Sequence, residues 1–182
     1  HKVCRVWGSD TWTNNVPFNS ALLKPPEDKF LVELPRMPWP TYAKRHLVMF
    51  GEYVPFEGLL RGVIAFFDLP MSRMSPGSAR QGNLTIVIDG EGFEVAPAIC
   101  YEIAYGESLR KRSIESSAII SVSNDTWFGS TNGPWQHLQI AKVRAIENAK
   151  PVLRATNNGI TAIIDKNGVI VDALPQFTSG VL

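Results

Sequence analysis

Long apolar runs, a strong charge of either sign and a supply of cysteine are all missing from this sequence. A bilayer-spanning helix needs about 18 uninterrupted apolar residues. The nearest run, 59–69, is broken by Arg61, Gly62 and Asp68. The formal net charge is +1, which gives no electrostatic reason to expect a nucleic acid as partner. The sequence therefore predicts neither a membrane span within it nor a nucleic-acid-binding surface.

Cysteine and histidine are too few and too scattered for a metal site. The two cysteines, Cys4 and Cys100, permit one disulfide at most and no cysteine-based zinc site. The three histidines lie far apart along the chain. We therefore expect no metal and no cofactor.

The remaining composition is that of an ordinary globular domain. With 182 residues, 45% of them hydrophobic and 19% charged, the chain is long enough for one α/β domain with a real core. It opens without an initiator methionine or an apolar signal segment, and it ends after a strand-like segment. We expect residues 1–182 to be a single, partial domain of a longer protein.

Strand and helix patterns alternate through the second half of the chain. Apolar runs bounded by turn residues predict strands at 84–88, 93–99, 118–122, 152–156, 159–164 and 169–172. Helical periodicity predicts helices at 106–117 and 136–149. Upstream we expect a strand at 20–23, irregular proline-rich chain at 24–40, and a short helix or buried loop at 56–70. Together these patterns predict an α/β sandwich.

Cys100 is the first candidate for chemistry, because it follows a predicted strand whose last residues are small or apolar. Proteins of the α/β class place reactive groups at the carboxyl ends of their strands. Glu102 could orient neighbouring groups or a substrate amine, and the backbone N–H of Tyr101 could donate to an oxyanion. Position alone does not separate this interpretation from a buried structural cysteine.

Lys44 and Glu52 form a second candidate. A lysine in a turn is usually a solvated charge, but apolar residues follow Lys44, and Glu52 lies eight positions further on. A buried pair of these two would hold a positive charge beside a thiolate and a developing oxyanion. The solvated charge remains the alternative.

Two polar segments follow later predicted strands. The run 121–129 includes Asp125, Trp127 and Phe128 and is typical of a loop that lines a pocket. A packed turn with both aromatic rings in the core fits it as well. The run 154–161 is a strand, a turn and a strand, which ordinary turn chemistry explains.

In their order, these motifs resemble those of the bacterial apolipoprotein N-acyltransferases, a branch of the nitrilase (carbon–nitrogen hydrolase) superfamily. The resemblance runs from Ser20 to Leu182 and rests on 44–48, 50–55, 99–102, 123–129, 133–137 and 154–159. It implies an α-β-β-α sandwich, N-terminally incomplete in this chain, and a Glu-Lys-Cys catalytic triad.

The resemblance also implies roles for particular residues. Cys100 would be the nucleophile that takes an acyl chain from a phospholipid and passes it to the N-terminal diacylglyceryl-cysteine of an apolipoprotein. Lys44 would stabilise the tetrahedral intermediate. The supporting residues would be Glu52, Glu102, Tyr101 and Trp127. The implied location is the bacterial inner membrane, with the catalytic domain facing the periplasm and transmembrane helices outside this sequence.

The sequence departs from the family pattern in its general base. That glutamate lies upstream of the lysine in the family, and here Glu27 and Glu33 stand in the proline-rich stretch and match no motif. In addition, Met49 stands where the family usually has proline. Two alternatives stay open: a soluble nitrilase-like amidase, and a non-catalytic remnant of the fold. We expect the 182-residue chain alone to be inactive.

Overall fold

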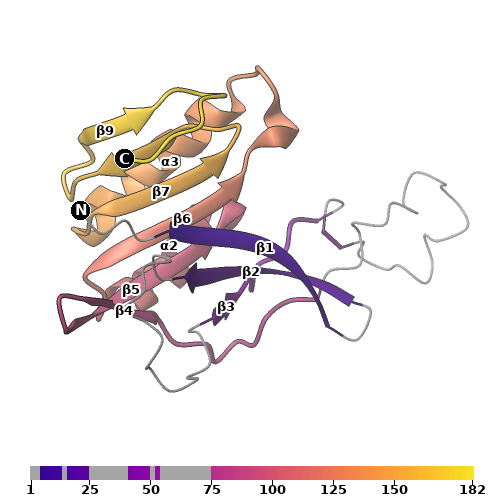
Figure 1. Cartoon of the computed structure of the whole chain (residues 1–182), viewed down its shortest axis with the longest axis vertical. Coiled ribbons are helices and arrows are strands. Elements are labelled where there is room, and N and C mark those ends of the chain that lie inside the picture. The colour runs from indigo at the N-terminus through magenta and orange to yellow at the C-terminus, as the bar shows by residue number, and fades with distance from the viewer. Residues whose placement is uncertain (1–4, 14–15, 25–40, 50–51, 54–74) are drawn as a thin grey trace, which may run out of the picture.

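The computed structural model describes residues 5–13, 16–24, 41–49, 52–53 and 75–182, which form two sheets (Figure 1). The larger sheet has six strands in chain order: β4 (Leu84–Ile88), β5 (Glu91–Ile99), β6 (Ala118–Asn124), β7 (Val152–Asn157), β8 (Thr161–Ile164) and β9 (Ile170–Leu174). The smaller sheet contains β1 (Arg5–Thr13), β2 (Val16–Lys24) and β3 (Thr41–Ala43).

Two α-helices and the smaller sheet cover opposite faces of the larger sheet. Helix α2 (Gly106–Ser113) packs on β5 and helix α3 (Gly133–Asn148) packs on β7, while β2 contacts β5 and β1 contacts β6 (Figure 1). The described residues thus form helix, sheet and sheet layers, and the predicted α/β sandwich is confirmed. Among these residues, no helix combines the length and the apolar character that crossing a membrane requires.

Alternation along the central strands produces a core on each face of the larger sheet. On the helical face, Ala96 and Ala98 of β5 join a buried cluster with Leu138 and Ala141 of α3. On the other face, the intervening β5 residues Val95 and Ile99 pack with Tyr42 of β3, Leu84, Ile120 and Val122. The near-continuous apolar character of β5 and β6 follows from burial on both sides.

Strands β5, β6 and β7 run parallel, so their carboxyl ends lie at one edge of the sheet. Two short 3₁₀ helices follow there, η4 (Cys100–Ala104) after β5 and η5 (Thr126–Phe128) after β6. The backbone N–H of Asp125 donates to the carbonyl oxygen of Asn157 across 3.0 Å. The candidate nucleophile and the polar loops after β6 and β7 therefore share this edge.

The predicted elements agree with the structure except near a few ends. The helix predicted at 106–117 stops at Ser113, whose hydroxyl donates to the carbonyl oxygen of Leu109, and the chain then turns through Ser116. The helix predicted at 136–149 begins earlier, at Gly133. Strands β1 and β3 were not predicted. The stretches 25–40 and 56–70 lie outside the described residues, as do Cys4, Glu27 and Glu33.

Candidate active site

Cys100 occupies a sharp turn between strand β5 and helix η4. Its backbone φ is +53°, in the left-handed region that residues other than glycine rarely adopt. Such a conformation costs about 1–3 kcal/mol and persists only where surrounding contacts hold it. The thiol is free and partly exposed. A tight strand-to-helix turn of this kind presents a nucleophile at the edge of a sheet.

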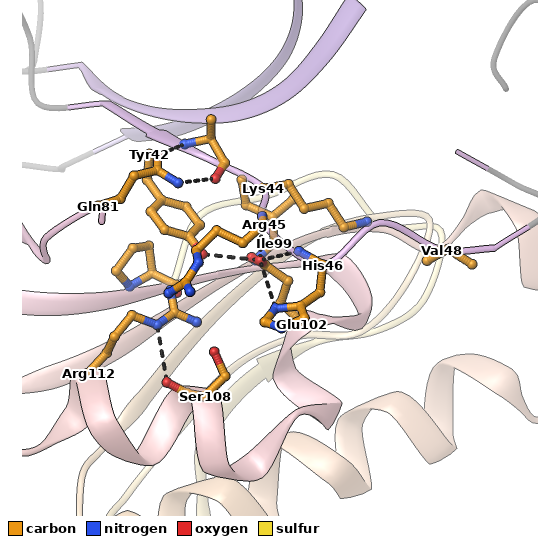
Figure 2. Close-up of polar contacts among 12 residues, drawn as sticks. Tyr42, Lys44, Arg45, His46, Val48, Gln81, Ile99, Glu102, Ser108 and Arg112 are labelled. Atoms are coloured by element: carbon orange, nitrogen blue, oxygen red, sulfur yellow. Dashed lines mark hydrogen bonds and ion pairs between the residues drawn. The ribbon is translucent and has the colours of Figure 1, made fainter. Parts of the chain in front are cut away.

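Glu102, two residues further on, has a fully buried side chain with both carboxylate oxygens engaged (Figure 2). One oxygen, Oε2, accepts the backbone N–H of Ile99 at 2.9 Å. The other, Oε1, accepts the backbone N–H groups of Arg45 at 2.8 Å and His46 at 3.2 Å and the hydroxyl of Tyr42 at 3.1 Å. Of the two roles considered for Glu102, this geometry fits the orientation of neighbouring groups.

These hydrogen bonds hold the two candidate segments together. Ile99 precedes Cys100 and Arg45 follows Lys44, so one carboxylate ties the turn of the thiol to the turn of the lysine. Burial raises the pKa of Tyr42, and the negative charge of Glu102 raises it further. The Tyr42 hydroxyl therefore stays protonated and remains a donor.

Lys44 forms a buried ion pair with Glu52. Its Nζ lies 2.6 Å from Glu52 Oε1, and the side chains are 0% and 14% exposed, respectively. The other oxygen of Glu52 accepts the backbone N–H of Val48 at 2.9 Å. In Figure 2 the Lys44 side chain points away from Glu102 and toward the segment of Val48. The structure thus contains the Lys–Glu pair considered from the sequence, and the solvated-charge alternative for Lys44 is wrong.

Asp125, after strand β6, is a second fully buried carboxylate. Its Oδ1 accepts the Ser123 hydroxyl at 2.6 Å and lies 3.0 Å from His137 Nδ1, while Oδ2 accepts Arg154 Nη2 at 2.7 Å. Burial alone would raise the pKa of Asp125, but the hydrogen bond from His137 and the charge of Arg154 hold it below its usual range. The group is therefore an anion near neutral pH.

The turn after strand β7 is shaped to fit Asp125. A Cβ atom on Gly159 would collide with the Asp125 carboxylate, so only glycine allows this close approach. Asn158, just before it, has a φ of +55° and donates its amide to the Thr126 hydroxyl at 3.0 Å. The Asn157-Asn158-Gly159 run is thus a turn that also packs against a buried charge.

Aromatic side chains surround the Cys100 edge and are open to solvent. Trp127 is 68% exposed and Phe128 38% exposed, so the alternative that both rings lie in the core is wrong. Tyr101 is also exposed and meets Tyr105 edge-on, with ring centroids 6.0 Å apart. An edge with this much exposed aromatic surface fits a site for an apolar ligand.

A family model described as carbon–nitrogen hydrolase matches residues 2–182. The chain belongs to the carbon–nitrogen hydrolase family. Among solved structures, a CN-hydrolase superfamily protein from Xanthomonas campestris aligns with a TM-score of 0.65 and 20% identity, over 98% of this chain and 60% of its own. A glutamine-dependent NAD+ synthetase from Acinetobacter baumannii aligns with a TM-score of 0.65 and 15% identity, over 99% of this chain and 30% of its own. At these identities the likeness shows the fold alone.

Closer relatives are curated as apolipoprotein N-acyltransferases. Those of Pseudomonas paraeruginosa and Shewanella oneidensis are 51% and 52% identical to this chain over 142 residues. The match covers 78% of this chain but 27% of each relative. This carbon–nitrogen hydrolase chain therefore spans about a quarter of the length of the relatives it matches.

Sequence reasoning found the Cys100 side of the site and missed part of the Asp125 side. Glu102 links the turns of Cys100 and Lys44, and the sequence had offered the orientation of neighbouring groups as one of two roles for it. His137 and Arg154 stood inside recognised motifs, but nothing in the sequence indicated that they meet at one carboxylate. Their contacts cross 12 and 29 positions of the chain and depend on how α3 and β7 dock.

Proposed function

We propose that this chain is the acyl-transferring part of an apolipoprotein N-acyltransferase, located at the bacterial inner membrane with its catalytic part facing the periplasm. The observation that carries the proposal is the 51–52% identity to curated apolipoprotein N-acyltransferases over 142 residues. A partly exposed thiol in a strained turn and a buried lysine held beside that turn also support it.

In the first half-reaction, the Sγ of Cys100 attacks the ester carbonyl carbon of a phospholipid. A C–S bond forms, the ester C–O bond breaks, and the lysophospholipid leaves as an alcohol with the proton that the thiol gave up. By family resemblance a glutamate carries this proton, and no described residue is assigned that role. Lys44, kept in place by Glu52, faces the negative charge of the tetrahedral intermediate.

In the second half-reaction, the α-amino group of a diacylglyceryl-cysteine attacks the thioester. A C–N bond forms, the C–S bond breaks, and the amine proton returns to the Cys100 thiolate. The exposed Trp127 and Tyr101 offer apolar surface to the acyl chains of donor and acceptor. The product is an N-acylated apolipoprotein.

The proposal is tested on the full-length natural protein incubated with phospholipid alone. Mass spectrometry of the cleaved protein should find one acyl chain on Cys100, and a diacylglyceryl-cysteine peptide added afterwards should remove it as an amide. Cys100→Ala should abolish the adduct, whereas Cys4→Ala should leave it in place. Lys44→Met should slow adduct formation by roughly 10²–10³-fold, the range for losing one oxyanion stabiliser.

Other outcomes would point elsewhere. Transfer that survives in Cys100→Ala, or the lack of any adduct in the unmodified protein, would overturn the proposal. An adduct that only water releases, with no amide product, would indicate a hydrolase of the lipid ester instead of an acyltransferase. We expect the 182-residue chain tested alone to form no adduct.

A further inference from the structure

His137 links the Cys100 turn to a charged cluster that the proposed chemistry does not use. The ring lies on helix α3 and is 4% exposed. Its Nδ1 lies 3.0 Å from Asp125 Oδ1, and its Nε2 lies 3.2 Å from the backbone carbonyl oxygen of Cys100. Both ring nitrogens therefore have a partner at hydrogen-bonding distance.

Both of these partners can only accept a hydrogen bond. A backbone carbonyl oxygen has no proton to donate, and Asp125 is ionised because His137 and Arg154 hold its pKa below the usual range. The contact with the Cys100 carbonyl oxygen therefore requires a donor on Nε2 of the ring.

Arg154 holds Asp125 in place, and Asp125 in turn holds the ring of His137. Arg154 on β7 donates Nη2 to Asp125 at 2.7 Å and Nε to the carbonyl oxygen of Ile160 at 3.3 Å. With Asp125 after β6 and His137 on α3, a chain of contacts runs from β7 to the Cys100 backbone. It connects the turn of the nucleophile to the buried pair of Asp125 and Arg154.

We propose that His137 is a positioning residue for Cys100, whose ring Nε2–H donates to the Cys100 carbonyl oxygen and holds the left-handed turn that aims the thiol. The proposal deepens the proposed function, because it rests on Cys100 being the nucleophile. The turn, with its φ of +53°, needs such an outside contact to persist. Glu102 holds the residue before Cys100 from one side, and His137 holds the carbonyl of Cys100 itself.

The test compares three variants of the full-length protein. His137→Ala removes both contacts, and His137→Gln keeps one N–H donor that can reach the carbonyl. Gln139→Ala changes an exposed residue of the same helix and serves as the control. For each we measure kcat and KM for the phospholipid in thioacyl formation, and the alkylation rate of Cys100 by iodoacetamide relative to Cys4.

A misaimed nucleophile lowers kcat and leaves the binding of the donor intact. We expect His137→Ala to lower kcat by roughly a hundredfold and to leave KM within about twofold. The Cys100 alkylation rate should fall as well, His137→Gln should recover part of both rates, and Gln139→Ala should match the unmodified protein. Rates within about twofold of the unmodified protein in His137→Ala would overturn the proposal.

Two further readouts keep the proposal separable from folding and from the proposed function. If His137→Ala does not fold, ¹⁵N NMR of the histidine ring in the unmodified protein decides, with His137→Gln used to assign the signal. A proton on Nε2 at pH 7 would support the proposal, and an Nε2 without a proton would overturn it. If no thioacyl adduct forms in any variant, the proposed function fails, while the alkylation rates still test His137.

Discussion

Glu102 and Asp125 are two fully buried carboxylates that hold the Cys100 edge in different ways. Glu102 accepts hydrogen bonds from three backbone N–H groups and one hydroxyl, all of them neutral donors, and the His46 ring lies beyond hydrogen-bonding distance, with Nδ1 3.8 Å from Oε1. Asp125 is bound by the guanidinium of Arg154, by the ring of His137 and by one hydroxyl. One carboxylate is stabilised by dipoles and the other by opposite charges.

The difference indicates which parts of the edge depend on charge balance. Backbone donors cannot titrate, so the link from Glu102 to the Lys44 and Cys100 turns persists wherever the carboxylate is ionised. The Asp125 cluster holds its parts only while each charge keeps its partner, because a lone charge in the interior is very costly. Removing a charge should therefore damage the Asp125 cluster more than the Glu102 cluster.

Arg154→Met is expected to have the largest effect. It leaves the Asp125 carboxylate buried without its cation, and breaking a buried pair in this way costs about 3–5 kcal/mol of unfolding free energy. Urea denaturation of the full-length protein, followed by tryptophan fluorescence, measures the loss. Arg110→Met is the matched control, because Arg110 pairs with Glu107 on the exposed face of α2. If Arg154→Met and Arg110→Met lost the same unfolding free energy, the buried Asp125 cluster would not depend on charge balance more than a surface pair does.

Glu102→Gln is expected to have a smaller effect. The amide oxygen can still accept from Arg45, His46 and Tyr42, and only the N–H of Ile99 then faces another donor. Leaving one buried donor unsatisfied costs about 1–3 kcal/mol. The same denaturation experiment measures it, with Glu147→Gln on the exposed side of α3 as control. A loss as large as that of Arg154→Met would show that Glu102 too depends on charge compensation.

The contrast also explains what the sequence could and could not predict. The strand before Cys100 and helix α3, which begins within the 133–137 motif, carry strong local patterns, so their presence was predictable. The apolar residues after Lys44 suggested a buried lysine beside the thiolate, and the resemblance supported the same arrangement. The donors around Glu102 are mainly backbone N–H groups, which every residue except proline has, so no side-chain pattern in the sequence predicts them.

The missed parts of the fold and site depend on long-range packing. Strand β1 has a polar sequence with two tryptophans and no clear apolar alternation. It is defined by its antiparallel pairing with β2, from Arg5↔Lys24 to Thr13↔Val16. Strand β3 has three residues and is defined by its pairing with β2. His137 similarly meets Asp125 and Cys100 only after α3 docks, so its place in the 133–137 motif does not reveal these contacts.

The pH dependence of stability is the mildest expected difference. The folded-state pKa of Asp125 is depressed, whereas in the unfolded chain an aspartate titrates near about 3.9. The stability that the ionised Asp125 contributes is therefore complete above the unfolded-state value and is lost as the pH falls toward the folded-state value. We expect the unfolding free energy to fall as the pH drops below about 4, and less steeply in Asp125→Asn than in the unmodified protein.

Glu107 provides the matched comparison for this pH effect. A hydrogen bond from Arg110 lowers the pKa of Glu107 to about 2, but both side chains are exposed, so solvent screens the interaction. Glu107→Gln should therefore keep most of the acid dependence of the unmodified protein. If Asp125→Asn kept the acid dependence of the unfolding free energy equally well, the buried Asp125 cluster would contribute no more to that dependence than a surface pair does. The difference between the Glu102 and Asp125 clusters would then appear only in variants that lose a partner of the carboxylate, and not in the pH dependence of stability.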